Sequence, residues 1–464
     1  MIRNLKKNTE DLEVKQTLHI YEGIAHMISM EKDSEKQKVL LESLMQYTQN
    51  DWEKVLEIAN KDQNSLQDIE VIKMIGFIVK ANERVAYALG TPYVTHLAKI
   101  FLELLQIYRL YSENISFVIG NSSRSYNVDI LKACKTVRRY ILNLVQTFIK
   151  KSEDHKLVVS EFLPKLSDLI SDYNSNVPNA RDPEVLSLFA TLIEHMGDEM
   201  IQFIPDILNC MFESTLSMIS DNYTSFMDFR RNFFTLIKNI VDNCLEGLFQ
   251  ASQESFKTCI DSIIWAIKHY QIELAEIGLE TMNELLSNVV KNDEVANVFF
   301  ENFYMPIMRD TFYVLTDSLH KSGFYKQALI IMKLVSVVEN GMFKGTLSSD
   351  YSNNKEYVIE YLSDALVKLF PNTSKTQIQT FVLNMFNNCD NKKEFVGTMR
   401  DFLIALKEFA GEDQEDLYKQ EQQIALKEAQ EKENMKKQAI PGLVTEAFTR
   451  PNGSADFDDE EEDL

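Results

Sequence analysis

The chain is poor in the two residues that interrupt regular structure. Its 464 residues include only 14 glycines and 9 prolines, together about 5% where an average protein has about 12%. β-Sandwiches and propellers need many tight turns, so this shortage argues against both and favours long helices. Length alone suggests about three domains of roughly 150 residues, although a repeat array spreads the same length over one continuous core.

Cysteine and histidine are scarce and scattered. The five cysteines form no CxxC pair, and the seven histidines form no HExxH motif or Cys/His cluster. An odd number of widely spaced cysteines is typical of reduced, buried thiols and not of a disulfide framework. We therefore expect no metal site and no cofactor. The cysteines are Cys134, Cys210, Cys244, Cys259 and Cys389.

Long apolar runs are absent as well. The most apolar stretch, residues 328–338, is eleven residues long and contains Lys333, so it is too short and too polar to span a bilayer. The first fifteen residues include basic side chains but no apolar core of a secretory signal. We expect a soluble, intracellular protein without a membrane segment.

Sequence motifs for catalysis are missing too. The chain has no GxxxxGK[ST], GxGxxG or GxSxG motif, and so few glycines leave little scope for loops that cradle phosphates. Carboxylates do lie beside histidines, as Glu194 does beside His195. On an amphipathic helix such a pair is more simply explained as a solvated surface than as a general acid and base. We expect no enzyme activity.

The charge balance is strongly acidic. The sequence has 48 Lys and Arg against 70 Asp and Glu, a net charge of −22. Because phosphate backbones are anionic, broad nucleic-acid binding is disfavoured and a basic protein partner is favoured. One local cluster is basic, and it is either a solvated helix surface or a stripe for an acidic partner. It comprises Lys132, Lys135, Arg138, Arg139, Lys150 and Lys151.

Helical periodicity runs through almost the whole chain. Between residues 185 and 196, apolar residues recur at i, i+4, i+7, i+8 and i+11, which is one continuous stripe on a helix. Asp182 is a candidate N-cap, Pro183 suits the first helical position, and Gly197 suits the end. Comparable helices are predicted at residues 13–30, 68–89, 92–119, 129–151, 158–173, 205–220, 226–244, 254–270, 272–291, 294–317, 321–339, 355–370, 374–387 and 392–410.

The spacing of these helices indicates a repeat. The first helices of three successive pairs begin near residues 182, 226 and 272, which are 44 and 46 residues apart. Antiparallel helix pairs with this period are typical of HEAT and armadillo arrays. Each pair buries its apolar stripe by stacking on the next, so the sequence predicts an all-α, HEAT-repeat superhelical solenoid. The alternative is one large, irregular helical domain.

Composition changes after residue 410. Residues 411–438 are helix-forming but highly charged, so this helix either packs through a narrow seam or projects from the body. Residues 451–464 carry seven acids and no base, a charge of −7, which predicts a disordered tail. The tail acts as a solubiliser, a cation binder or an electrostatic competitor for a basic groove. Its acids are Asp456, Asp458, Asp459, Glu460, Glu461, Glu462 and Asp463.

Several segments resemble one family in order along the chain. They are YSENIS (111–116), NVPNARDPEVLS (176–187), FESTLSMI (212–219), DSIIWAIKH (261–269), DFLIALKEFAGEDQEDLY (401–418), EQQIALKEAQ (421–430) and IPGL (440–443). The chain resembles the C-terminal part of the exportin-one nuclear export receptors, within the importin-β-like superfamily, from about residue 16 onward.

This resemblance implies a function and a division of the chain. Such receptors bind leucine-rich export signals of cargo proteins together with Ran in its GTP state, pass the nuclear pore, and shuttle between nucleus and cytoplasm. It implies HEAT-type repeats at residues 1–92, the exportin C-terminal domain at 93–410, a regulatory helix at 411–438 and an acidic tail at 439–464. In the family, the helix and tail favour a closed, low-affinity groove when Ran is absent.

The chain departs from the family in length. By the resemblance, it starts after the repeats that form the export-signal groove, and none of its cysteines corresponds to the family's reactive groove cysteine. We therefore expect the regulatory end of an export receptor without the cargo groove. The alternative is a stand-alone HEAT-repeat scaffold or decoy that binds no cargo.

Overall fold

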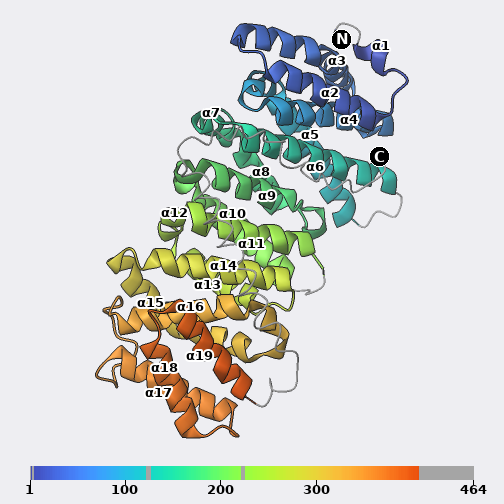
Figure 1. Ribbon diagram of the computed structural model, residues 1–464. Helices are drawn as coiled ribbons and strands as arrows, with labels where there is room; N and C mark the ends of the chain where they lie inside the picture. The colour runs from blue at the N-terminus through green and yellow to red at the C-terminus, as the bar shows by residue number, and fades with distance from the viewer. Residues whose placement is uncertain (1, 3–4, 122–126, 221–224, 407–464) are drawn as a thin grey trace, which may run out of the picture. The chain divides into compact units, whose positions relative to one another are not determined.

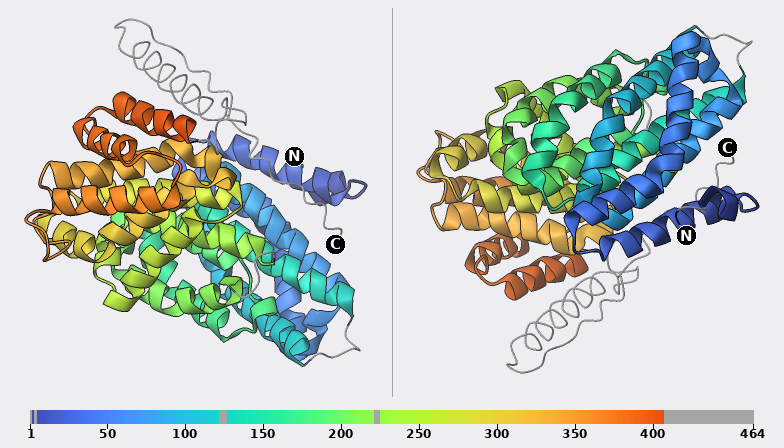
Figure 2. Two further views of the ribbon diagram at one scale, coloured as in Figure 1. Left: turned by 90° about the horizontal axis from the view of Figure 1, so that it is seen from below. Right: turned by 90° about the horizontal axis from the view of Figure 1, so that it is seen from above.

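The protein is described here by a computed structural model, which covers residue 2 and residues 5–121, 127–220 and 225–406. Every regular element in these ranges is helical, and the helices pack against one another in pairs (Figures 1 and 2). The predicted all-α repeat architecture is confirmed. Backbone contacts divide the chain between Thr258 and Cys259, inside one helix. We describe the two units separately.

Helices of the first unit form two rows. In row 1, each helix packs directly on the next, in the order α2, α4, α6, α9 and α11. Row 2 contains α5, α8 and α10, packed in that order, together with α3, which packs on α2 and α4. The helices are α1 (Leu5–Thr9), α2 (Val14–Ser29), α3 (Ser34–Lys61), α4 (Ile69–Leu89), α5 (Val94–Gly120), α6 (Val128–Lys151), α7 (His155–Glu161), α8 (Leu163–Ser175), α9 (Glu184–Met196), α10 (Ile204–Ser220), α11 (Met227–Asn243) and α12 (Leu245–Phe249).

The second unit repeats this plan. Its row 1 contains α14, α16 and α19, and α16 packs on both of the others. Helix α15 packs along α16, and α17 packs on α18. The helices are α13 (Gln253–Ile267), which spans the division between the units, α14 (Ile272–Val289), α15 (Asp293–Thr316), α16 (Phe324–Glu339), α17 (Asn354–Leu369), α18 (Lys375–Asn387) and α19 (Lys392–Ala405).

Local sequence signals lie at both ends of α9; Gly197 ends the helix as predicted, whereas the N-cap is Pro183 and not Asp182, so the helix starts one residue later than predicted, at Glu184. The Asp182 carboxylate accepts a hydrogen bond from the backbone N–H of Glu184 at 3.1 Å, satisfying a donor that the first helical turn leaves free. At the other end, Gly197 has a φ of +50°, a conformation that residues with a Cβ rarely adopt. The predicted starts near 182, 226 and 272 agree with α9, α11 and α14 to within two residues.

Three other predictions were wrong in detail. Helix α3 was missed, because its apolar residues are thinly spread among polar ones and only six of its 28 residues are buried. The single helix predicted at 158–173 is two, α7 and α8, and the second begins at Leu163 with Pro164 in its first turn. The helix predicted from residue 321 begins at Phe324, after a short 3₁₀ turn.

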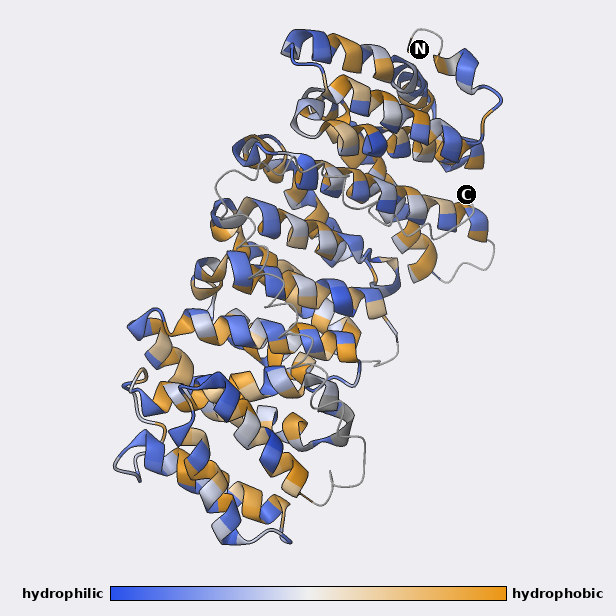
Figure 3. Cartoon of the chain, in the orientation of Figure 1, coloured by the Kyte–Doolittle hydropathy of each residue, from blue (hydrophilic) through white to orange (hydrophobic). Residues whose placement is uncertain are grey.

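The core consists of buried apolar side chains of the packed helices. Hydrophobic and hydrophilic residues alternate along each helix (Figure 3). Helix α4, between α2 and α6, has 11 buried residues among 21. Gly90 ends this helix with a φ of +63°, and a Cβ there would lie 2.5 Å from the carbonyl oxygen of Lys151 at the end of α6. Glycine therefore permits the close approach of the two helix ends.

A buried polar cluster ties α6 to α5 and to the turn before α9. Arg138 of α6 is 2% exposed. Its guanidinium donates hydrogen bonds to the carbonyl oxygen of Ala180 at 3.1 Å and to the hydroxyl of Tyr108 at 3.4 Å, and it lies 3.7 Å from the Asp182 carboxylate. Since breaking a buried charge pair typically costs about 3–5 kcal/mol, this cluster fixes the position of the turn at residues 178–182.

Among the helices that the structure describes, none combines the length and apolarity needed to cross a bilayer. The predicted boundaries after residues 92 and 410 stay predictions.

Candidate partner-binding face

Polar side chains connect the successive helices of row 1 in the first unit. Each bond joins two neighbouring helices, and the donor–acceptor distances range from 2.9 to 3.4 Å. These groups occupy the flanks of each helix, which face the neighbouring row-1 helices. We call the side of each helix that points away from its neighbours and from the core its outward stripe, and this side is left for contacts with other molecules. The bonds run from Arg84 to Glu22, from Thr147 to Glu83, from Ser187 to Gln146, and from Asn239 to the carbonyl of Ala190.

The outward stripe of α6 is basic. Lys132, Lys135, Arg139, Asn143 and Lys150 follow one another at intervals of three, four, four and seven residues, which places them on one side of the helix. The three lysines are exposed, and Arg139 and Asn143 are half-buried. This arrangement fits both alternatives named from the sequence, a solvated helix surface and a stripe for an acidic partner.

Two members of the predicted basic cluster, Arg138 and Lys151, do not belong to this stripe. Arg138 points into the protein and is held by the buried cluster described above. Lys151 lies on the side of α6 that faces α4, where its ammonium is 4.4 Å from the centre of the Tyr87 ring. The sequence showed where basic residues cluster but not which of them a turn from elsewhere in the chain would cover.

Helix α4 adds three basic residues beside this stripe, each of them close to a carboxylate: Lys73 to Glu70, Lys80 to Glu83 and Arg84 to Glu22. Lys73, Lys80 and Arg84 are spaced by seven and four residues, on one side of the helix. The Lys80 ammonium lies 4.4 Å from the centre of the Tyr140 ring of α6 and 3.1 Å from the buried Glu83 carboxylate. We call the outward residues of the two helices the basic face. It consists of Lys73 and Lys80 of α4 and of Lys132, Lys135, Arg139 and Lys150 of α6. Arg84 and Lys151 lie on the flanks, where they contact the neighbouring helices.

The basic face stands out in a chain with a net charge of −22. Basic side chains interleaved with the rings of Tyr87 and Tyr140 can hold an acidic polypeptide through charge and through contact with its apolar groups. The α4 part was missed by sequence reasoning, although the spacing of Lys73 and Lys80 within one predicted helix was the signal that marks it.

The other candidate residues show no chemistry of their own. All five cysteines are free, and all but Cys210 are buried. Burial raises the pKa of the Cys134, Cys244 and Cys259 thiols to about 12, so they are protonated at neutral pH. The Nδ1 atom of His195 is hydrogen-bonded to the backbone oxygen of Thr191, one turn earlier in the same helix. Within the described ranges, no three His, Cys, Asp or Glu side chains gather as metal ligands.

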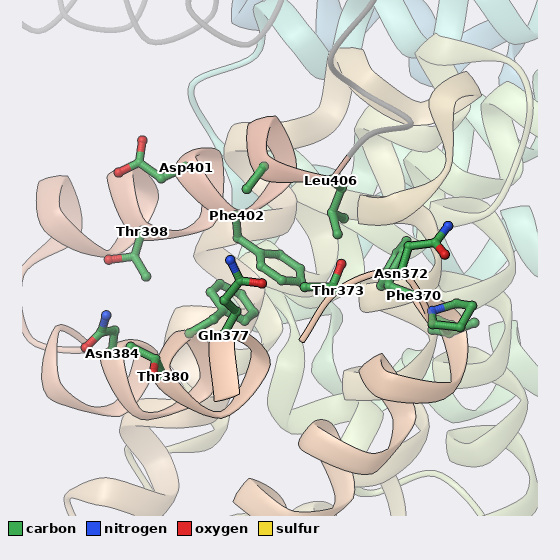
Figure 4. Close-up of a pocket in the computed structure, with 14 residues that line it drawn as sticks. Phe370, Asn372, Thr373, Gln377, Thr380, Asn384, Thr398, Asp401, Phe402 and Leu406 are labelled. Atoms are coloured by element: carbon green, nitrogen blue, oxygen red, sulfur yellow. The ribbon is translucent and has the colours of Figure 1, made fainter. Parts of the chain in front are cut away.

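The second unit has an open pocket between α18 and α19 (Figure 4). Its volume is about 510 Å³. The rings of Phe381 and Phe402 stack with centroids 3.8 Å apart, and the amides of Asn372 and Gln377 and the carboxylate of Asp401 are among the polar groups that line the pocket. The lining is therefore mixed, with aromatic, amide and carboxylate groups.

The predicted regulatory helix at 411–438 and the seven tail acids, Asp456, Asp458, Asp459, Glu460, Glu461, Glu462 and Asp463, lie outside the described residues.

Comparison with known proteins identifies the family. A family model described as CRM1 C terminal matches residues 96–411. Exportin-1 of Dictyostelium discoideum is 36% identical over 458 residues, which is 97% of this chain and 42% of that protein. The chain belongs to the exportin-1 family. EXPORTIN 1B of Arabidopsis thaliana is 35% identical over 94% of this chain, and Exportin-1 of Schizosaccharomyces pombe is 33% identical over 96%.

Exportin-1 relatives are much longer than this chain, which spans 41–42% of the length of the curated proteins it matches. The matched family region, residues 96–411, contains α6 and the pocket between α18 and α19. The predicted family is confirmed by these matches. The names of the relatives associate the family with nuclear export.

Proposed function

We propose that this chain is the C-terminal part of a nuclear export receptor that carries proteins with leucine-rich signals from nucleus to cytoplasm together with Ran in its GTP state. The observation that supports this most is the 36% identity to Exportin-1 along 97% of the chain. In this proposal the chain acts by binding and conformational coupling, without catalysis, while shuttling through the pore in contact with nuclear pore proteins. It binds no nucleic acid directly.

Within this function we assign the basic face to an acidic polypeptide. The exposed ammonium groups of Lys132, Lys135 and Lys150 are complementary to the −7 charge of residues 451–464. The tail then occupies the face when Ran is absent and is displaced when Ran binds. An attraction between exposed charges weakens as salt rises, so this regulation is sensitive to ionic strength.

Ran binding tests the function itself. The full chain is immobilised, and binding of Ran is compared in its GTP and GDP states by biolayer interferometry. We expect binding to Ran-GTP that is at least tenfold tighter than to Ran-GDP, and tighter still after removal of residues 411–464. Equal binding of the two nucleotide states contradicts the proposal.

Matched variants locate the Ran-GTP contact. The double change Lys132→Glu and Lys150→Glu should alter Ran-GTP affinity in the chain without its tail. Lys257→Glu, an exposed lysine of α13 far along the sequence from α6, serves as the control. If both variants behave like the unmodified chain, the basic face is not part of the Ran-responsive surface.

A second candidate is a stand-alone scaffold or decoy that occupies Ran or pore proteins without cargo. The chain spans 42% of the length of its Dictyostelium relative, and the two candidates differ in the size of the native protein. An immunoblot of cell extract with an antibody to the tail separates the two. A band well above 100 kDa indicates a complete receptor, and a band near 53.7 kDa, the mass of this sequence, indicates the scaffold.

A further inference from the structure

Two lysines of α16 reach across to α14 in the second unit. Lys326 and Lys333 are seven residues apart, so they lie on the same side of the helix, two turns from each other. The Lys326 ammonium forms an ion pair with the Glu280 carboxylate at 2.7 Å. Lys333 has partners of another kind. Its Nζ atom donates hydrogen bonds to the backbone oxygen of Asn283 at 2.6 Å and to the hydroxyl oxygen of Ser287 at 2.7 Å.

Both hydrogen-bond partners of Lys333 are neutral. Within the described ranges, Lys333 forms no ion pair with a carboxylate. A neutral amine has two N–H groups and a lone pair, so it can donate to both oxygens and keep its lone pair available for reaction. The charged form gains a third N–H but no opposite charge beside it. The site therefore satisfies the neutral amine, whereas an ion pair such as that of Lys326 favours the ammonium form.

Burial acts in the same direction at Lys333. It lowers the pKa of this lysine below its usual value of 10.5; the Glu284 carboxylate of α14 opposes the shift, and the Lys392 ammonium of α19 adds to it. The side chain is half-buried and not sealed from solvent. Because the neutral amine is the nucleophilic form of lysine, Lys333 is more reactive at neutral pH than a lysine held in an ion pair.

We propose that Lys333 is a modification site that is acylated by a small acyl thioester. The lone pair of the neutral amine attacks the carbonyl carbon of the thioester, so that a C–N bond forms and the C–S bond breaks. The nitrogen releases one proton, and the leaving sulfur takes up a proton. The products are an amide at Lys333 and a free thiol.

Acylation also changes the contact between α14 and α16, which pack directly on each other. The amide nitrogen keeps a single N–H, so it can donate to Asn283 or to Ser287 but not to both. The modification therefore removes one of the hydrogen bonds between the two helices. The proposal requires neither Ran nor an export signal, so it stands or falls separately from the proposed function.

The test measures the acylation rate of individual lysines. The full chain is treated with N,S-diacetylcysteamine, a small acetyl thioester, and proteolysis followed by mass spectrometry gives the rate at each site. At about pH 7.5 we expect Lys333 to react at least about threefold faster than Lys326, because Glu280 favours the charged form of Lys326. The ratio should fall as pH rises toward about 10.4, where ordinary lysines lose their proton as well.

Two matched variants exchange the surroundings of the two lysines. Ser287→Asp places a carboxylate beside Lys333 and should slow its acylation at least about threefold. Ser287→Ala removes the hydroxyl without adding a charge, and Lys333 should then still react faster than Lys326. Glu280→Gln removes the carboxylate from Lys326 and should speed the acylation of that lysine while leaving Lys333 the same. Circular dichroism checks that each variant is folded.

Any of three results overturns the proposal. The first is a rate at Lys333 that is equal to or below the rate at Lys326 at about pH 7.5. The second is an unchanged rate at Lys333 in folded Ser287→Asp. The third applies also if Ser287→Asp fails to fold: an unchanged rate at Lys326 in Glu280→Gln means that a neighbouring carboxylate does not control the reactivity of these amines.

Discussion

Helices α6 and α14 both belong to row 1 of their units, yet their outward stripes carry opposite charge. On α6 the stripe holds Lys132, Lys135, Arg139 and Lys150. On α14 the residues at intervals of three, four and four are all glutamates, and Glu280 forms an ion pair with Lys326 at 2.7 Å. The glutamates are Glu273, Glu276, Glu280 and Glu284.

The buried sides of the two helices are alike. Both pack apolar residues inward, and both join the next row-1 helix through polar groups on their flanks. On α6, Gln146 accepts a hydrogen bond from Ser187 of α9. On α14, Asn283 donates to the carbonyl oxygen of Lys326 at 3.0 Å, and Lys333 of α16 donates back to the carbonyl oxygen of Asn283 at 2.6 Å. The inward and flanking residues therefore serve the same packing in both helices, and the outward stripes differ in charge.

The largest expected effect comes from breaking the inward side of α6. Arg138→Ala removes the buried guanidinium, so the Asp182 carboxylate and the Ala180 carbonyl lose their partner. The free energy of unfolding should therefore fall by about 3–5 kcal/mol. Urea unfolding followed by circular dichroism measures this. Arg139→Ala, the neighbouring half-buried arginine of the outward stripe, is the matched control. Equal effects of the two changes would remove the distinction between the two sides of the helix.

The second prediction concerns an inward histidine in row 2. Burial lowers the pKa of His96 on α5 to about 4, against 6.5 in an unfolded chain, with Lys99 lowering it further and Glu42 opposing the shift. Below pH 6.5 the unfolded state binds the proton better, so the stability that the neutral imidazole contributes above pH 6.5 is lost as pH falls toward 4. The full loss is on the order of 3 kcal/mol.

Unfolding measured between pH 7 and 4 tests this, with two variants. His96→Leu should flatten the decrease. His26→Leu, at a side chain that is 53% exposed on α2, should leave the decrease as it is. If His96→Leu retains the whole pH dependence, other groups cause it.

Features of the fold that depend on local sequence signals could be predicted, and features that depend on distant residues could not. The apolar stripe, Asp182 and Gly197 are local signals, so α9 was predicted with its end at Gly197 and with a start one residue early. The burial of Arg138 was not predicted, because it depends on contacts with Tyr108 and with the carbonyl of Ala180, which are 30 and 42 residues away in the sequence. No local pattern encodes such contacts, whereas the exposed lysines of α6, Lys132, Lys135 and Lys150, were identified from the sequence.

The third prediction uses charge to compare the outward stripes directly. A fluorescent peptide of residues 451–464, which carries a charge of −7, should bind the chain lacking residues 411–464. Lys132→Glu with Lys150→Glu should weaken this binding about tenfold at low salt, and raising salt to about 0.5 M should do the same. Fluorescence anisotropy measures both.

The control for the peptide is the acidic stripe of the second unit. Glu280→Lys with Glu284→Lys changes the net charge by the same amount, in the opposite direction, on α14. If this variant gains as much affinity as the α6 variant loses, the peptide responds to net charge and not to the basic face.

The smallest effect is expected where an outward residue is removed without reversing its charge. Lys132→Ala on α6 and Glu280→Ala on α14 should each change the free energy of unfolding by less than about 0.5 kcal/mol, because exposed ions and surface ion pairs contribute little. The same urea titration that detects Arg138→Ala provides the scale. A loss above about 1 kcal/mol at either position would mean that the outward stripe also supports the fold, and its charge would then be constrained by stability and not left free for binding.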